Sequence, residues 1–300
     1  MRVAAVDIGT NSTRLLIVET DGSELIDVKR LATVTALGRG VDRSRRLAAD
    51  AIERTVTALA GYATSIESAG VTSARAVATS ASRDATNKET FFDAAQSALG
   101  FRPEAISGAE EARLSFVGAT NGVDHAKGAV VIDTGGGSTE FVGMRRGVSV
   151  DIGSVRLTER CLPNHPASFV ELDAARTEAA RAVASREVPT GTHAIGVAGT
   201  WTSLAAMHQN LEAYDSVRIN GSMLRLDDVR HLVNWLRTRS LAEKQAIPSL
   251  DPKRAPVILG GAVVAEASLQ ALALDRITVS EHDILDGVCL GLLGVRSPEL

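Results

Sequence analysis

Short apolar runs that end in polar turns alternate along this chain with longer stretches in which apolar residues recur at helical spacing. Ile52, Val56, Leu59 and Ile66 fall on one face of such a stretch, which predicts an amphipathic helix over residues 47–68. In the first half the pattern further predicts a hairpin at 4–18, strands at 24–37, 74–79 and 102–106, and helices at 86–99 and 107–119. Strands followed by alternating helix and strand are typical of an α/β domain.

The second half repeats this plan. Its pattern predicts strands at 128–133, 140–145, 148–152, 194–198 and 277–280, and helices at 168–186, after 199, at 226–236, at 258–274 and from 283. The polar stretch at 121–124 is the expected boundary. We therefore predict two related α/β domains, 1–124 and 125–300, with a last helix that can pack back on the first domain.

Two helix starts carry the signature of a capping box, in which a Ser or Thr side chain and a Glu three residues later satisfy each other's backbone N–H groups. Thr86 with Glu89 predicts the start of one helix, and Ser107 with Glu110 predicts the start of the next. In this interpretation Glu110 has a structural role.

Composition narrows the functional classes. The net charge of −4 with interspersed signs disfavours a general nucleic-acid or membrane-surface binder, although a local basic groove can exist on a mildly acidic protein. No apolar run approaches 18 residues, and two cysteines, Cys161 and Cys289, are too few for a disulfide framework. We expect a cytoplasmic protein without nucleic-acid or membrane partners.

One motif occurs twice. The same four residue types stand in the same order and spacing in both copies, each time between two apolar runs. They are Asp7, Gly9, Ser12 and Thr13 in the first copy and Asp133, Gly135, Ser138 and Thr139 in the second. Successive N–H groups in such a glycine-containing turn form an anion-binding concavity. A plain glycine-rich hairpin is the alternative for one loop, but the duplication disfavours it. Neither copy continues into Gly-Lys-Ser/Thr, which disfavours a Walker-type NTPase.

These loops predict the ligands of a phosphate and its metal. Backbone N–H groups and hydroxyl or amide side chains are the expected phosphate donors: Asn11, Ser12, Thr13, Gly135, Gly136, Gly137 and Ser138. Asp133 and Glu140 can reach a divalent cation, directly or through water, and Asp7 is the equivalent carboxylate of the first loop. The expected cofactor is Mg²⁺, with Mn²⁺ as another candidate.

Glu111 and three arginines are further candidates. Glu111 shares a helix face with Leu114 and other small or apolar residues, and partial desolvation suits a general base. From the residues alone, a first-turn Glu that stabilises the helix dipole is the commoner case. Arg83 follows a strand end in a serine-rich turn and, like Arg156 and Arg14, could bind phosphate, whereas most single arginines are solvated.

The chain resembles the Ppx/GppA phosphatases, exopolyphosphatases and guanosine pentaphosphate phosphohydrolases of the actin, Hsp70 and sugar-kinase superfamily. The resemblance is carried by DIGTNS (7–12), ATSASRDA (78–85), ISGAEEAR (106–113), DTGGGSTE (133–140), GSVRLTER (153–160), AGT (198–200) and SEHDILDG (280–287). It implies two ribonuclease H-like (actin-like ATPase) domains with a cleft between them, in a short form without the extra C-terminal helical domain.

The resemblance also implies an activity. The expected reaction is Mg²⁺-dependent release of terminal phosphate from polyphosphate, from pppGpp, or from both, by a homodimer. It places the catalytic Glu at Glu111 and a phosphate-binding Arg at Arg83.

Two other functions remain open from the sequence. A kinase of the same superfamily would usually present an Asp base and an acceptor pocket, neither of which is readable here. A non-catalytic sensor of pppGpp or polyphosphate need not retain a base such as Glu111. Three further features have no assigned role: the turn at 199–203 with Trp201, the basic residues Lys244, Lys253 and Arg254 as contributors to a polyphosphate channel, and the pair His282-Asp283 as a helix cap.

Overall fold

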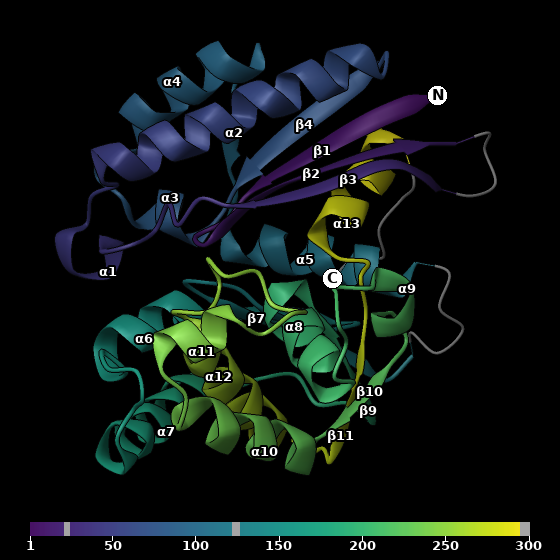
Figure 1. The fold of residues 1–300 in the computed structure, drawn as a ribbon. Coiled ribbons are helices and arrows are strands. Elements are labelled where there is room, and N and C mark those ends of the chain that lie inside the picture. The colour runs from purple at the N-terminus through teal and green to yellow at the C-terminus, as the bar shows by residue number, and fades with distance from the viewer. Residues whose placement is uncertain (21–24, 122–126, 295–300) are drawn as a thin grey trace. The chain divides into compact units, whose positions relative to one another are not determined.

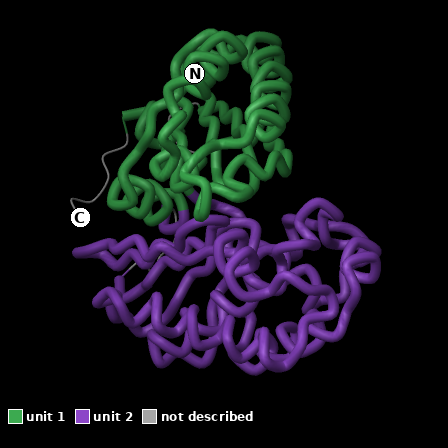
Figure 2. The backbone as a smooth tube through the Cα atoms, turned by 90° about the vertical axis from the view of Figure 1, so that its left-hand side faces the viewer, with its two compact units in different colours: residues 1–118, 284–298 green, residues 119–283, 299–300 purple. Residues whose placement is uncertain are grey.

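The computed structural model describes residues 1–20, 25–121 and 127–294. The chain divides into two compact units, residues 1–118 with the segment from Ile284, and residues 119–283 (Figure 2). The predicted boundary at 121–124 falls almost entirely outside the described residues, and the division itself follows Gly118. The last helix is grouped with the first unit.

Unit 1 is built on a five-stranded sheet in the order β3-β2-β1-β4-β5 (Figure 1). The strands are β1 (Arg2–Ile8), β2 (Ser12–Glu19), β3 (Ile26–Val34), β4 (Ser73–Ala78) and β5 (Glu104–Ala105). The first three pair antiparallel, whereas β4 and β5 join parallel to β1. This is the ribonuclease H-like order that the resemblance implied.

Side chains of β1 alternate between two cores, as the period of two in a strand requires. Ala4, Val6 and Ile8 face a core with α2 (Ala49–Ser68) and α4 (Lys88–Leu99). Val3 and Ala5 face the opposite core with α5 (Gly108–Thr120) and α13 (Ile284–Leu292). The sheet is therefore covered on both faces (Figure 1). Two short helices, α1 (Val41–Ser44) and α3 (Ser80–Asp84), complete the unit.

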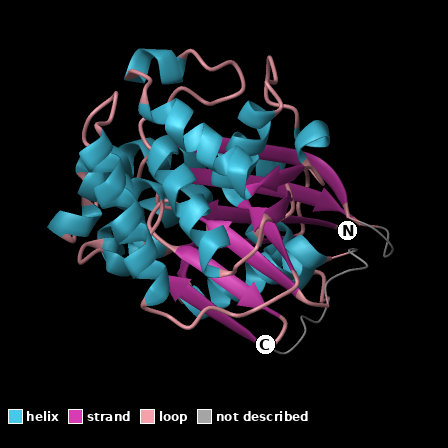
Figure 3. Cartoon of the chain, turned by 90° about the horizontal axis from the view of Figure 1, so that it is seen from below, coloured by secondary structure: helices cyan, strands magenta, loops and turns pink. Residues whose placement is uncertain are grey.

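Unit 2 repeats the sheet of unit 1 and adds one strand. Its order is β10-β11-β9-β6-β7-β8. The strands are β6 (Ala129–Thr134), β7 (Thr139–Gly143), β8 (Arg146–Val150), β9 (His193–Val197), β10 (Met223–Arg225) and β11 (Arg276–Val279). Again three antiparallel strands continue into two parallel ones, β9 and β11. The predicted α/β fold class is confirmed, and both sheets share this strand order. Figure 3 shows the helices and strands of the fold.

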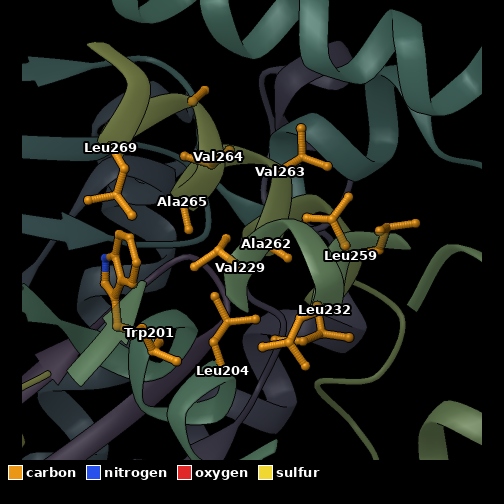
Figure 4. Packing of buried hydrophobic residues seen from close by; sticks show 14 of the residues in the cluster. Trp201, Leu204, Val229, Leu232, Leu259, Ala262, Val263, Val264, Ala265 and Leu269 are labelled. Carbon is orange, nitrogen blue, oxygen red and sulfur yellow. The ribbon is translucent and has the colours of Figure 1, made fainter. Parts of the chain in front are cut away.

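The core of unit 2 is organised by α12 (Ile258–Ala271), whose residues from Ile258 to Leu269 are all buried. It packs against α6 (Ser154–Cys161), α7 (Phe169–Ala184), α8 (Ala198–His208) and α10 (Leu226–Arg237). Figure 4 shows Val263 and Leu259 of α12 with Leu232 of α10 and Trp201 of α8. The expectation of a long helix across the core is confirmed. The remaining helices are α9 (Ser216–Ile219) and α11 (Leu241–Gln245).

Of the two predicted capping boxes, the one at Thr86 is not formed, whereas Ser107 does cap its helix. Thr86 does not cap α4: its hydroxyl donates to the Arg45 carbonyl, and Glu89 pairs with Arg102. That prediction was wrong because tertiary partners take both side chains. Ser107 does accept the Glu110 N–H at 3.1 Å, as expected. The Glu110 carboxylate, however, binds Arg75 at 2.7 Å.

A search of the helices in the described ranges found none with both the length and the apolar character that crossing a membrane requires.

Candidate phosphate-binding loops and catalytic carboxylate

The two copies of the repeated motif form the same turn. The Gly135 N–H donates to the Ser138 carbonyl at 3.1 Å, and the Gly9 N–H donates to the Ser12 carbonyl at 3.0 Å. A Cβ at Gly135 or Gly9 would lie 3.2 or 2.9 Å from that carbonyl oxygen, so both turns require glycine for close approach. The sequence repeat is therefore also a structural repeat.

The second loop presents a row of N–H groups. Within the described residues, the backbone N–H groups of Gly136, Gly137 and Ser138 donate no hydrogen bond, although all three residues are buried. A buried N–H group without an acceptor costs free energy, and successive groups of this kind form an anion-binding nest. These three N–H groups are therefore open to an anion, and their assignment to phosphate stays a prediction.

Helix α6 is docked on the same loop. The N–H groups of Val155 and Arg156 donate to the Gly136 carbonyl at 2.9 and 3.1 Å, and the Ser154 N–H donates to the Gly135 carbonyl at 2.9 Å. These bonds turn the loop carbonyls away from an anion. They also place Arg156, which is 8% exposed, beside the loop that it was predicted to serve.

Gly153 makes this docking possible, and sequence reasoning missed its role. A Cβ at Gly153 would lie 2.6 Å from both the carbonyl carbon and the carbonyl oxygen of Gly136. No local sequence signal marks this role, because it depends on the approach of Gly136. Helix α6 was not predicted, because its eight residues are too few to show a clear period.

The predicted metal ligands of unit 2 lie directly opposite each other. Asp133 and Glu140 are register partners on β6 and β7 and are only 6% and 1% exposed. Ser149 donates to one Glu140 oxygen at 2.6 Å. Like charges in directly opposite positions repel each other, and a bound cation would offset this repulsion. The donor set therefore suits a hard divalent cation such as Mg²⁺.

Within the described ranges there is no group of three or more His, Cys, Asp or Glu residues arranged to hold a metal. This agrees with Mg²⁺ chemistry, in which one or two carboxylates are typically completed by water and substrate phosphates. Asp133 and Glu140 are a pair of that kind.

Asp7 differs from its counterpart. Its register partner is Arg14, whose Nε and Nη2 atoms donate to Asp7 Oδ2 at 3.0 and 2.7 Å. The first hairpin thus has the cationic side chain of Arg14 at the position that corresponds to Glu140 in the second hairpin. The structure gives Asp7 a neutralising partner, which weakens the case for Asp7 as a metal ligand.

The other predicted residues of the first loop divide into two kinds. Thr13 is fully buried, and its hydroxyl bonds that of Thr35 at 3.1 Å, which is a structural role. The carbonyl of Asn11 accepts from Thr35 and Ala36, whereas its N–H donates nowhere within the described residues. Ser12, at the start of β2, supplies the carbonyl that closes the turn. The phosphate-binding role of Asn11 and Ser12 stays a prediction, and Thr13 supports the turn.

Glu111 and Arg83 are brought together in unit 1. Arg83 Nη1 on α3 donates to Glu111 Oε2 on α5 at 2.6 Å and to the Ile106 carbonyl at 3.1 Å. Glu111 is 8% exposed, as its apolar helix face predicted. A guanidinium at this distance stabilises the carboxylate form, which is the form a general base needs. Arg83 was predicted as a phosphate ligand, and its observed partner is the candidate base.

The turn at Gly199 and Trp201 belongs to the core. Trp201 is fully buried, and a Cβ at Gly196 would lie 2.7 Å from its ring, so Trp201 neither blocks nor stacks on a ligand (Figure 4). The Arg254 guanidinium lies against Gly199, so a side chain at position 199 would require Arg254 to move. The hydroxyl of Thr200 donates to the Thr134 carbonyl at 2.9 Å, which joins this turn to the glycine loop.

Lys244 is not available for a polyphosphate channel. Its side chain is fully buried and bonds His165 Nδ1 at 2.8 Å, so that prediction was wrong. Burial lowers the pKa of Lys244 to about 8. Lys253 is exposed and its role in a channel stays a prediction.

A separate cavity of about 690 Å³ lies between the end of α8, α10 and α11, with Leu211, Leu232 and Trp235 among its apolar walls. None of the predicted site residues lines it. Two of its carboxylates already serve helix starts, because Asp228 accepts from the Arg225 N–H and Glu243 accepts from Ser240. The cavity therefore contributes nothing to the candidate phosphate site.

Comparison with known proteins finds relatives along almost the whole chain. The family model described as the Ppx/GppA phosphatase family matches residues 5–295. A Mycobacterium tuberculosis protein named Exopolyphosphatase 2 is 42% identical, over 98% of this chain and 99% of its own length.

Solved structures similar to this chain belong to the same family or resemble it. The crystal structure of an exopolyphosphatase-like protein has a TM-score of 0.90 and 34% identity and covers 97% of this chain and 98% of its own. A Ppx/GppA family member from Aquifex aeolicus has a TM-score of 0.82 and 29% identity, with coverage of 98% and 97%. The match to the family model, residues 5–295, spans both repeated loops and Glu111.

Proposed function

Since this chain belongs to the Ppx/GppA phosphatase family, we propose that it is an Mg²⁺-dependent phosphohydrolase that releases terminal orthophosphate from inorganic polyphosphate. The observation that carries the proposal is the row of buried N–H groups at Gly136, Gly137 and Ser138, which lack an acceptor within the described residues. An anion is the ligand that this row fits.

The residues of the chain have separate roles in the proposed reaction. The N–H groups of the second loop, with the Ser138 hydroxyl and Arg156, bind the equatorial oxygens of the terminal phosphoryl group. Asn11 and Ser12 are the candidate phosphate donors of unit 1. Glu111 accepts a proton from the attacking water, and Arg83 keeps Glu111 ionised and oriented. Phosphoryl transfer needs mainly positioning and charge neutralisation, which these groups supply.

Asp133 and Glu140 would hold Mg²⁺, which supplies charge neutralisation for the phosphate oxygens when it is bound. The two carboxylates are preorganised for this task because β6 and β7 fix them in register. Ser149 orients Glu140 through its 2.6 Å hydrogen bond.

The proposal extends to pppGpp. The donors of the second loop are backbone groups that recognise a phosphoryl group and not the remainder of the molecule. Any substrate with a terminal phosphoanhydride therefore presents the same group to the loop, and pppGpp is such a substrate.

Phosphate release tests the proposal. The purified protein with Mg²⁺ is incubated separately with polyphosphate, pppGpp and ATP, and orthophosphate is measured over time. We expect release from polyphosphate, and a loss of at least about 10²-fold in the variant Glu111→Gln with binding retained. Glu110→Gln is the matched control, because Glu110 lies beside Glu111 but pairs with Arg75.

Other outcomes would contradict the proposal. Binding of polyphosphate or pppGpp without any release would identify a sensor. Transfer of phosphate from ATP to an acceptor without polyphosphate hydrolysis would identify a kinase. Full activity in Glu111→Gln would remove Glu111 from the reaction.

A further inference from the structure

Helix α13 crosses α5 at a glycine. A Cβ at Gly287 of α13 would overlap the Leu114 carbonyl oxygen of α5 and would lie 2.8 Å from the carbonyl carbon and 3.1 Å from the Cα atom of Leu114. Real Cβ contacts are not this short, so a side chain at Gly287 would force one helix to move. The atoms it meets are backbone atoms, which cannot swing aside as the end of a side chain can.

The contact lies one turn from the candidate base. Leu114 follows Glu111 by three residues, so the two share a face of α5. Leu114 also belongs to the buried cluster that contains Leu285 and Val288 of α13. The position of Glu111 along the helix axis is therefore fixed by the same packing that requires Gly287.

Helix α13 is itself anchored to the sheet. Arg30 of β3 donates through Nη2 to both oxygens of Asp286, at 3.0 and 3.2 Å, and Asp286 is only 4% exposed. Asp286 directly precedes Gly287. A side chain at position 287 would thus press α5 away from a helix that is held by a partly buried ion pair and by its apolar face.

The other end of this chain of contacts is the ion pair of Glu111. Arg83 reaches Glu111 at 2.6 Å and is tied to the Ile106 carbonyl at 3.1 Å. Arg83 lies on α3 and not on α5, so a shift of α5 would lengthen the pair. The carboxylate would then lose both its orientation and part of the charge that keeps it ionised.

We infer that Gly287 is a positioning residue for Glu111. Because Gly287 has no side chain, α13 packs closely against α5, and this packing holds Glu111 within hydrogen-bond distance of Arg83. This inference rests on the proposed function of Glu111. It assigns a role in the reaction to the last described helix, which contains none of the predicted site residues.

The matched variants are Gly287→Ala and Gly291→Ala. Both glycines lie in α13, but a Cβ at Gly291 meets nothing within 4 Å. For Gly287→Ala we expect kcat on polyphosphate to fall about 10- to 100-fold with KM nearly unchanged, because small misplacements of a reacting group cost this much. The acid limb of the pH profile should move to higher pH. Gly291→Ala should match the parent protein in both measurements and melt at an equal or higher temperature.

A milder variant covers the case in which Gly287→Ala does not fold. Arg30→Gln removes the anchor of Asp286 but adds no atoms at the helix crossing. It should lower kcat in the same direction by about threefold or more and should shift the acid limb in the same sense. Unchanged kcat and pH profile in a folded Gly287→Ala, or in Arg30→Gln, would overturn the inference.

A measurement without substrate separates this inference from the proposed function. The coupling between Arg83 and Glu111 is obtained from thermal unfolding of Arg83→Gln, Glu111→Gln and the double variant. The coupling should be present in the parent and Gly291→Ala backgrounds and lost with Gly287→Ala. Loss of coupling in a protein that hydrolyses no phosphate would support the positioning role and overturn the proposed function alone, and retained coupling would overturn the positioning role.

Discussion

Asp133 and Glu140 stand opposite each other across β6 and β7, in the register positions that Asp7 and Arg14 occupy across β1 and β2. The same hairpin therefore carries an acid–base pair in unit 1 and an acid–acid pair in unit 2. The first pair is neutral by itself, whereas the second places two carboxylates opposite each other, and Glu140 of this pair also accepts from Ser149 at 2.6 Å. The two repeated loops thus share the same turn hydrogen bond but differ in the charge of the paired side chains.

This difference predicts the thermal response to Mg²⁺. Replacement of Glu140 by Gln removes one of two opposing buried charges, so the metal-free variant should melt at the same or a higher temperature than the parent protein. Mg²⁺ should raise the melting temperature of the parent protein, because a ligand that binds only the folded state stabilises it. The rise should be largely lost in Glu140→Gln.

The measurement is a thermal melt with EDTA and with increasing Mg²⁺, and Glu212→Gln, which changes an exposed carboxylate of the same unit, is its control. A rise in Glu140→Gln equal to that of the control would contradict the assignment of Glu140 to the metal.

The pair of Arg83 and Glu111 predicts a second result. Arg83→Gln leaves Glu111 buried without its 2.6 Å partner. Because the Arg83 side chain is 23% exposed, solvent limits the cost, and we expect a loss of about 1–3 kcal/mol in the free energy of unfolding. Polyphosphate hydrolysis should fall by at least about 10²-fold. Urea unfolding and phosphate release measure the two effects.

The double variant Arg83→Gln/Glu111→Gln tests whether the loss of stability comes from breaking the pair of Arg83 and Glu111. It should recover part of the stability lost in Arg83→Gln, since the Glu111 charge that Arg83 binds is removed as well. Additive losses would show that the two side chains are not coupled.

Much of the fold could be predicted from the sequence because both sheets follow local rules. Amphipathic spacing located α2 and α10, and short apolar runs located β1 and β6. The short helices were not predicted. Helix α11, for example, has only five residues, which are too few to show a helical period. The capping box at Thr86 failed because a distant carbonyl, that of Arg45, competes for its hydroxyl.

The site was predictable only where it is local. The glycine loop with Asp133 and Glu140 lies within one hairpin, so spacing alone placed its parts together. The pairing of Arg83 with Glu111 joins two helices and could not be derived from spacing. Gly153 and Gly287 are recognisable only from the backbone atoms that approach them.

Gly153 supports a third prediction. In Gly153→Ala the new methyl group meets the carbonyl of Gly136, so α6 and the loop must separate. The bonds from Val155 and Arg156 to that carbonyl would weaken and the N–H row would lose its orientation. We expect KM for polyphosphate to rise about tenfold or more. Steady-state kinetics measure this, and Gly61→Ala, a helix position with free space, should leave KM unchanged.

Lys244 and His165 predict a pH dependence of stability. Burial lowers the pKa of Lys244 from 10.5 to about 8, and burial with the nearby Lys244 lowers the pKa of His165. Between pH 8 and 10.5 the unfolded chain keeps a proton on Lys244 that the folded protein has released. Stability therefore rises with pH across this window, and the penalty is fully present at pH 7.

The variant Lys244→Met removes this titration. From pH 7 to pH 10 the parent protein should gain about 2 kcal/mol of unfolding free energy relative to Lys244→Met, as the difference between the two pKa values requires. Urea unfolding at both pH values measures the gain, and Lys253→Met, at an exposed lysine, should follow the parent protein. An equal pH dependence in Lys244→Met and the parent protein would show that Lys244 titrates as an ordinary solvated lysine, in conflict with its burial against His165.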